Sequence, residues 1–347
     1  MVFFLPDRQE EGRGKEDNFM LRSMDSAVAG LRAHQNKMDV VGHNIANVNT
    51  FGFKAQTYTF KEAMYQTSSA STGGSGGAGG TNAAQYGYGT LMGSIGMDMT
   101  GSTPSYVGGF NASIDGEGFF ITSPALKSTG ISASDPDAIK AADFSYTRVG
   151  QFMVDNNGYI VDTNGNFIYG FRAVGDGTTG TTLEALRLPD VMTLDGNGDL
   201  PTSFSYSATT ASGVSLSTTI EINSLGKIMA TVKVKPKGAS ATDPATETRT
   251  IEIGQVALAT FQNPNGLAKV GGNYYQTTAN DNAGQVAASK PGEGGTASLM
   301  TGYIEASNVD LAKEFSDMIM TQRGFQANSK MITVGDEMLQ ELVNMKR

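Results

Sequence analysis

The sequence contains no cysteine, no tryptophan and only two histidines in 347 residues. A disulfide framework, a thiol nucleophile and a cysteine-bearing zinc site are therefore excluded. His34 and His43 stand nine positions apart, whereas two histidines that share a metal on one helix face stand three or four apart. No G-x-S-x-G elbow accompanies the many serines. We therefore expect no metal site, no cofactor and no enzymatic activity.

Basic charge and long apolar runs are also scarce. The 25 Lys and Arg residues are outnumbered by 34 Asp and Glu residues, so the chain lacks the basic excess with which proteins bind phosphate backbones. No apolar run approaches the ~18 residues of a membrane span. Residues 2–5 are apolar but stop at Pro6, short of the roughly 7 to 15 apolar residues of a secretory signal. We predict no nucleic-acid partner, no membrane insertion and no cleaved signal peptide.

Three stretches resemble ligand-binding motifs but lack residues that the chemistry needs. Residues 195–199 and 162–166 begin with calcium-loop spacing, yet Leu200 and Phe167 occupy the positions that require glycine. Turn chemistry explains these Asp and Asn residues better. Residues 74–79 contain a G-x-G-x-x-G spacing, but no strand precedes it and no helix follows, so no phosphate site is predicted.

The middle of the chain has the patterns of β structure. It is rich in glycine, with 44 residues in the whole sequence, which indicates many turns. Two Asn-Gly pairs, at 157–158 and 164–165, stand between alternating apolar residues and predict hairpins. Residues 172–250 are rich in Thr, Ser and β-branched residues and predict further strands.

Both ends of the chain have a helical pattern, with apolar residues at alternating spacings of three and four. Gln322, Ser329 and Asp336 interrupt the C-terminal stripe, which weakens it as a self-sufficient zipper. Periodicity alone leaves two interpretations open, packing of the two helices on each other within one chain and self-assembly between chains. The N-terminal stripe comprises Leu21, Met24, Val28, Leu31, Met38 and Ile45, and the C-terminal stripe comprises Leu311, Phe315, Met318, Phe325, Ile332, Leu339 and Val343.

The N-terminal helix ends in an unusually specified junction over residues 42–54. Asn44, Asn47 and Asn49 provide amide side chains that bond to nearby backbone, and Gly52 permits a turn that other residues resist. An ordinary helix end needs a single Gly or Asn. We therefore expect a packed junction, with Asn47 and Asn49 belonging to the assembly interface.

The two ends also resemble one known family. The run HQNKMDVVGHNIANVNTFGFKA at residues 34–55 resembles the N-terminal signature of bacterial flagellar hook and rod proteins, with His43 where that family more often has asparagine. Residues 307–347 resemble the other terminal signature of the family over their whole length. Residues 113–120, 147–165 and 253–278 resemble its first β domain and the return of the chain to it.

The resemblance implies a mainly β protein whose N- and C-terminal helices pair and carry nested, discontinuous β domains. We expect residues 1–19 to be a disordered leader or an artefact of start-codon choice, and residues 66–85 to be a flexible linker. The remaining divisions are a helical, coiled-coil-like assembly domain of residues 20–60 with 303–347, a first β domain of residues 86–171 with 251–302, and an inserted outer β domain of residues 172–250.

The resemblance further implies a structural subunit of the flagellar hook, the curved tube that couples the rod to the filament and transmits torque. Its partners would be copies of itself, the rod, the hook cap and the hook-filament junction proteins, and it would leave the cell through the flagellum-specific export apparatus. Three alternatives remain at this stage: a distal rod protein and, from other classes, a secreted β-rich adhesin with coiled-coil ends and, less favoured, a glycan-active enzyme.

Overall fold

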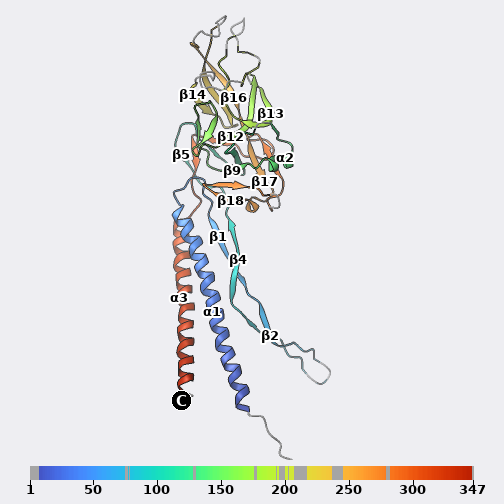
Figure 1. Ribbon diagram of the computed structural model, residues 1–347, viewed down its shortest axis with the longest axis vertical. Helices are drawn as coiled ribbons and strands as arrows, with labels where there is room; N and C mark the ends of the chain where they lie inside the picture. Colours follow the sequence, from blue (N-terminus) through green and yellow to red (C-terminus); the bar gives the residue numbers. More distant parts are fainter. Residues whose placement is uncertain are drawn as a thin grey trace, which may run out of the picture. The chain divides into compact units, whose positions relative to one another are not determined.

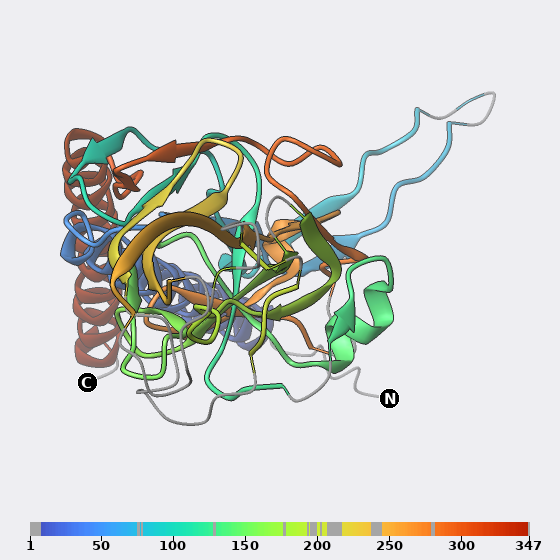
Figure 2. The same ribbon diagram turned by 90° about the horizontal axis from the view of Figure 1, so that it is seen from above.

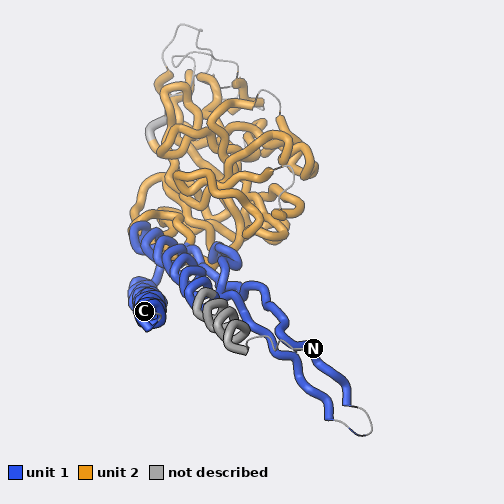
Figure 3. Tube along the Cα trace, turned by 60° about the horizontal axis from the view of Figure 1, so that its bottom comes forward, with its two compact units in different colours: residues 1–48, 55–98, 309–347 blue, residues 49–54, 99–308 orange. Residues whose placement is uncertain are grey.

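The computed structural model describes residues 8–345, apart from residues 75–76, 78, 128–129, 176–177, 193, 195–199, 202, 207–216, 237–244 and 279–281. The calcium-type spacing at residues 195–199 lies outside the described residues. The chain forms two compact units, coloured separately in Figure 3. Unit 1 comprises residues 1–48, 55–98 and 309–347, and unit 2 comprises residues 49–54 and 99–308.

Unit 1 is built from two long helices and one hairpin (Figure 1). Helices α1 (Arg8–Ala46) and α3 (Leu311–Met345) pack side by side in opposite directions. The hairpin has two antiparallel pairs, β1 (Gln56–Glu62) with β4 (Thr90–Met97) and β2 (Tyr65–Ser69) with β3 (Ala84–Gly87). Across the described residues, no helix combines the length and apolar character needed to cross a membrane.

Two expectations for unit 1 differ from the structure. Residues 66–85 do not link domains: their ends form β2 and β3, which pair with each other, so the Gly/Ser-rich segment connects the strands of one hairpin. A loop and a linker have the same composition, which is why composition could not separate them. In addition, α1 begins at Arg8, inside the segment for which we expected no regular structure.

Unit 2 is mainly β, as the sequence predicted, and all its strand pairs are antiparallel. Among the described residues, its largest sheet has fourteen strands and a main path ordered β14-β15-β16-β12-β7-β9-β19-β18. The elements of the unit are β5 (Pro104–Tyr106), β6 (Ala112–Ile114), β7 (Phe119–Ser123), β8 (Ile131–Ser132), α2 (Pro136–Ala141), β9 (Ser145–Thr147), β10 (Phe152–Val154), β11 (Ile160–Asp162), β12 (Phe167–Gly175), β13 (Thr178–Ala185), β14 (Ser217–Ile222), β15 (Lys227–Val234), β16 (Glu247–Val256), β17 (Leu258–Phe261), η2 (Pro264–Gly266), β18 (Ala268–Gly271), β19 (Tyr274–Gln276), β20 (Val286–Ser289), β21 (Leu299–Thr301) and β22 (Tyr303–Glu305).

The expected outer domain, residues 172–250, is not set apart in this division. Strand β12 runs through its first boundary and pairs with β16, which runs through the second. One hydrophobic core joins both sides: Phe120 and Ile168 lie in the same buried cluster as Val232. Figure 2 shows the strands of unit 2 from above. The change in amino-acid composition at residue 172 therefore does not coincide with a boundary between two hydrophobic cores.

The two predicted Asn-Gly hairpins are present. Gly158 and Gly165 have φ of 80° and 82°, a left-handed conformation that glycine adopts without a steric cost. Asp162 Oδ1 accepts backbone N–H bonds from Asn164 and Asn166, each at 2.9 Å. This carboxylate therefore holds the turn. Among the described residues, no three His, Asp or Glu side chains are grouped so that they could hold a metal ion.

Candidate assembly interface

The two helices of unit 1 approach each other closely at small residues, one of which faces Met24 of the predicted N-terminal stripe. A Cβ atom at Gly324 of α3 would lie 2.6 Å from the His34 ring of α1, and one at Gly30 would lie 2.7 Å from the Asn328 side chain. Near the other end of α3, a Cβ at Gly335 would lie 3.3 Å from Met24. The glycines therefore allow the close approach.

Polar contacts hold the helix pair at the end nearest the junction. Asn44 is 1% exposed, and its Nδ2 donates to Glu314 Oε1 at 3.1 Å and to the Gln56 carbonyl at 2.8 Å. Its Oδ1 accepts from the Gln56 N–H at 2.9 Å, so Asn44 joins α1, α3 and β1. Lys37 Nζ lies 3.1 Å from Asp317 Oδ1.

Two ionisable groups in this contact have shifted pKa values. Burial raises the pKa of Glu314, and the hydrogen bond from Asn44 opposes that shift. Burial lowers the pKa of His34, and the charge of Lys37 acts in the same direction. The ring of His34 packs between Gly324 and Phe60, whose ring centre lies 5.4 Å away.

Most of the predicted C-terminal stripe does not face α1. Leu311, Phe315, Phe325 and Val343 are 40%, 51%, 36% and 68% exposed, whereas Met318, Ile332 and Leu339 are half-buried. The reason is geometric, because a repeat of 3.5 residues drifts by about 20° per heptad around a straight helix. The stripe therefore shifts around the helix surface and does not stay on the contact with α1 along the length of α3.

The residues of the predicted N-terminal stripe differ less from one another in exposure. Met24, Leu31, Met38 and Ile45 are half-buried and Val28 is 38% exposed; the side chain of Leu21 lies outside the described residues. Asn47 Nδ2 donates to the His43 carbonyl at 2.9 Å, which supports the helix end, and Asn49 is exposed. The assignment of all these residues to an assembly interface stays a prediction.

Sequence reasoning missed a second apolar stripe on α3. Met320, Met331, Met338 and Met345 are 60%, 56%, 45% and 76% exposed. The last three follow one another at intervals of seven residues, so the sequence itself contains a signal for this stripe. Helix α3 therefore presents apolar side chains on two flanks besides its contact with α1.

The hairpin of unit 1 is also poorly covered. Met64, Tyr65, Leu91, Met92 and Ile95 are 46% to 80% exposed, and all residues of β2 and β3 are exposed. A two-stranded hairpin is at best marginally stable alone in water. Exposed apolar patches of this kind mark surfaces that contact other molecules.

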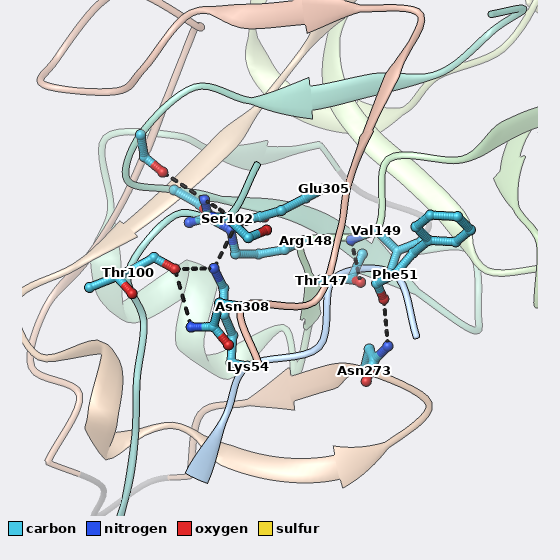
Figure 4. A network of polar contacts seen from close by, with 12 residues as sticks. Phe51, Lys54, Thr100, Ser102, Thr147, Arg148, Val149, Asn273, Glu305 and Asn308 are labelled. Atoms are coloured by element: carbon cyan, nitrogen blue, oxygen red, sulfur yellow. Dashed lines mark hydrogen bonds and ion pairs between the residues drawn. The ribbon is translucent and has the colours of Figure 1, made fainter. Parts of the chain in front are cut away.

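In unit 2, a buried carboxylate collects charged side chains from distant segments (Figure 4). Glu305 Oε1 accepts from Lys54 Nζ at 2.8 Å, and Glu305 Oε2 accepts from Arg148 Nε at 2.7 Å. These three side chains are at most 3% exposed. With Thr100, Ser102 and Asn308 they form what we call the Glu305 cluster.

Carbonyl groups complete the cluster, where two cations face one carboxylate. Lys54 Nζ donates to the Thr100 carbonyl at 2.6 Å, and Arg148 donates to the carbonyls of Gly116 and Gly118 at 2.7 and 3.0 Å. Buried charges need such partners. The sequence signal for this site was Lys54 in the Gly-Phe-Lys end of the N-terminal signature, and no local pattern pointed to Arg148.

The cluster lies where the chain enters and leaves unit 2. The chain passes between the units after residues 48, 54, 98 and 308. Glu305 bonds to the segments beside these crossings: its carbonyl accepts from the Gly52 N–H at 2.8 Å, and its side chain accepts from Lys54 and from the Ser102 N–H at 3.3 Å. The three stretches of unit 2 that carry the four crossings, which contain Gly52 with Lys54, Ser102 and Glu305, are therefore bonded together.

Comparisons with known proteins agree with both terminal signatures. Residues 24–54 match the model for flagella basal body rod proteins, and residues 300–345 match that for the C-terminal domain of flagellar basal body rod FlgEFG proteins. The chain is 36% identical to the flagellar basal-body rod protein FlgG of Bacillus subtilis over 329 residues, which covers 94% of this chain and 100% of that protein.

Two hook proteins are also similar. The flagellar hook protein FlgE of Borreliella burgdorferi is 29% identical over 459 residues, covering 94% of this chain and 100% of that protein. That of Caulobacter vibrioides is 49% identical over 98 residues, which cover 28% of this chain and 16% of that protein. The chain therefore belongs to the family of flagellar rod and hook proteins, which are structural subunits of the flagellum.

Proposed function

We propose that this chain is a subunit of the flagellar hook and assembles with copies of itself into a curved helical tube. The observation that carries the proposal is the pair of exposed apolar flanks on α3, beside a helix contact at which Gly30, Gly324 and Gly335 allow the close approach. A helix with two unpartnered flanks suits a lattice in which each subunit touches different neighbours on different sides. Such heterologous contacts do not close and build a helix.

Adaptable side chains favour the hook over a stiff rod. Four methionines form one of the flanks of α3 and a further two, Met64 and Met92, are exposed on the hairpin. Methionine is unbranched and repacks easily. Subunits of a bent tube that rotates about its own axis must exchange one packing for another, and a methionine surface tolerates that exchange.

The Glu305 cluster suits the transmission of force. A pull on the chain at these crossings reaches unit 2 at bonds to the side-chain carboxylate or the backbone carbonyl of Glu305. Short charge-assisted hydrogen bonds in a buried setting resist such displacement better than exposed pairs do. We propose that the cluster keeps the crossings together while the tube turns.

The remaining expectations follow from the hook assignment. The tube would meet the rod at one end, the junction proteins of the filament at the other, and a cap at its growing tip. The chain would act outside the cell and reach that place through the flagellum-specific export apparatus, without a cleaved signal peptide.

A distal rod subunit is the second candidate. The name of the Bacillus subtilis relative supports it. Electron microscopy of the purified chain under polymerising conditions tests both candidates. Short curved tubes are expected for the hook, straight rigid tubes would favour the rod, and failure to form tubes under any condition would contradict both.

A further inference from the structure

Unit 1 contains a groove beside the contact between its two helices. It has a volume of about 380 Å³ and lies where α1, α3 and β3 meet. Its lining includes Arg22, Ser26, Ala27, Tyr86, Asn328 and Met331. The volume is sufficient for one or two large apolar side chains.

The groove is apolar with a cation at one wall. Its lining is mostly apolar and includes Ala27, Met331 and Tyr86. The guanidinium carbon of Arg22 lies 5.7 Å from the centre of that ring. A fitting occupant would present apolar side chains together with a carboxylate.

The beginning of α3 has this combination. Leu311 and Phe315 are 40% and 51% exposed and stand one helical turn apart on the same flank. Asp310, directly before them, is exposed, and its Oδ1 caps the helix by accepting from the N–H groups of Ala312 and Lys313 at 2.9 and 3.3 Å. Its Oδ2 can approach a cation without loss of the cap.

We propose that the groove of one subunit receives Leu311 and Phe315 of a second copy of this chain, with Asp310 of that copy beside Arg22. The inference rests on the proposed function, because a homopolymer supplies the second copy. The groove and the α3 end are separated along the helix pair by roughly 24 Å, at about 1.5 Å per residue. The contact is therefore heterologous, and each copy offers its own groove to the next.

Cysteine cross-linking tests the contact directly, because the native chain has no cysteine. Ser26→Cys, within the groove, and Leu311→Cys are purified separately, mixed, polymerised and oxidised. A disulfide needs Cα atoms within about 7 Å. We expect a disulfide-linked dimer on a non-reducing gel from tubes but not from dilute monomer. The matched control is Ser26→Cys with Ser329→Cys, an exposed site on the same flank several turns further along.

The outcomes separate the contact from the function. If tubes form normally and the Ser26 and Leu311 cysteines do not link, or the control pair links equally well, the groove contact is overturned while self-assembly stands. If the unmodified chain forms no tubes under any condition, the proposed function is contradicted, and the groove contact, which rests on it, is contradicted with it.

Charge removal tests the ion pair by an independent route. Asp310→Asn keeps a good N-cap and removes the charge, and Arg22→Gln removes its partner. Each change should raise the critical concentration for assembly about two- to fivefold, as expected for a partly exposed ion pair. The double variant should be no worse than either single variant, whereas effects that simply multiply would contradict pairing of the two residues.

Discussion

At the scale of single residues, burial separates charges that stabilise unit 2 from charges that do not. Glu305 is enclosed with two cations, so Glu305→Gln leaves both facing a neutral amide. Removing one partner of a buried ion pair typically costs ~3 to 5 kcal/mol. We expect a loss of that order in the free energy of unfolding, measured by denaturant titration of the β signal.

The matched control for this prediction is an exposed pair in the same unit. Glu247 and Arg249 are 43% and 48% exposed and lie 3.5 Å apart. Glu247→Gln should change the free energy of unfolding by less than ~1 kcal/mol. Equal costs for the two Glu→Gln changes would show that the Glu305 cluster does not stabilise the unit.

Glu314 makes the stability of unit 1 depend on pH. Its pKa is raised in the folded chain by burial, so the folded state binds this proton more tightly than the unfolded state does. Protonation of Glu314 therefore stabilises folding, an effect complete below the ordinary value of about 4.5 and lost as the pH rises through the raised pKa.

Glu314→Gln should remove that dependence while keeping an acceptor for Asn44. Thermal melts followed by helical circular dichroism, at pH 4.5 and 7.5, compare the two chains. The native chain should gain more stability on acidification than the variant does. His34, whose pKa is lowered, acts with the opposite sign in both chains, and so it cancels in the comparison. An identical response of the two chains would contradict the prediction.

At the scale of elements, the contact between α1 and α3 depends on glycine. Gly324→Ala would place a methyl group 2.6 Å from the His34 ring, and overpacking of this kind costs ~1 to 3 kcal/mol. We expect lower thermal stability of the helical signal. Gly42→Ala in α1 is the control: nothing lies within 4 Å of its Cβ position, so it should stabilise the helix by up to ~1 kcal/mol. A neutral Gly324→Ala would contradict close packing at this point.

Element types were predictable from the sequence, and the contacts between elements were not. Period and turn chemistry are local, so the terminal helices and the hairpin turns at Gly158 and Gly165 followed from short stretches. The residues that pack against a given face of a helix, in contrast, come from distant parts of the sequence. Hydrophobicity singled out the stripe through Phe315 and Phe325, whereas the helix pair formed through Gly30 and Gly324, which a search for apolar residues passes over. Arg148 was missed for the same reason, because its partners are distant in sequence.

At the scale of the whole molecule, the shared core changes what a deletion should do. The sequence treated residues 172–250 as separable, but they contribute Ile228 and Val232 to the core that also contains Phe120. Replacing them by a short Gly-Ser link should therefore abolish cooperative unfolding of unit 2. Shortening the hairpin loop at residues 70–83 to a tight turn is the control and should leave that transition intact. A deletion variant whose unit 2 still melts cooperatively would show that residues 172–250 are a separable outer domain after all.

Assembly and folding should respond to different residues of the same chain. Phe325 is 36% exposed on α3, so Phe325→Ala removes little from the monomer core, and the melting transition of unit 2 should not move. In a tube the same ring would be covered at every subunit, where Phe→Ala in a packed site costs ~3 to 5 kcal/mol. Polymer yield measured by sedimentation should therefore fall sharply. Phe120→Ala, in the core of unit 2, should show the opposite pattern: it should lower the melting temperature of unit 2 in the monomer, which Phe325→Ala leaves unchanged. Normal polymer yield from Phe325→Ala would remove this flank of α3 from the interface, whereas a lowered transition of the monomer would place Phe325 in an intramolecular core.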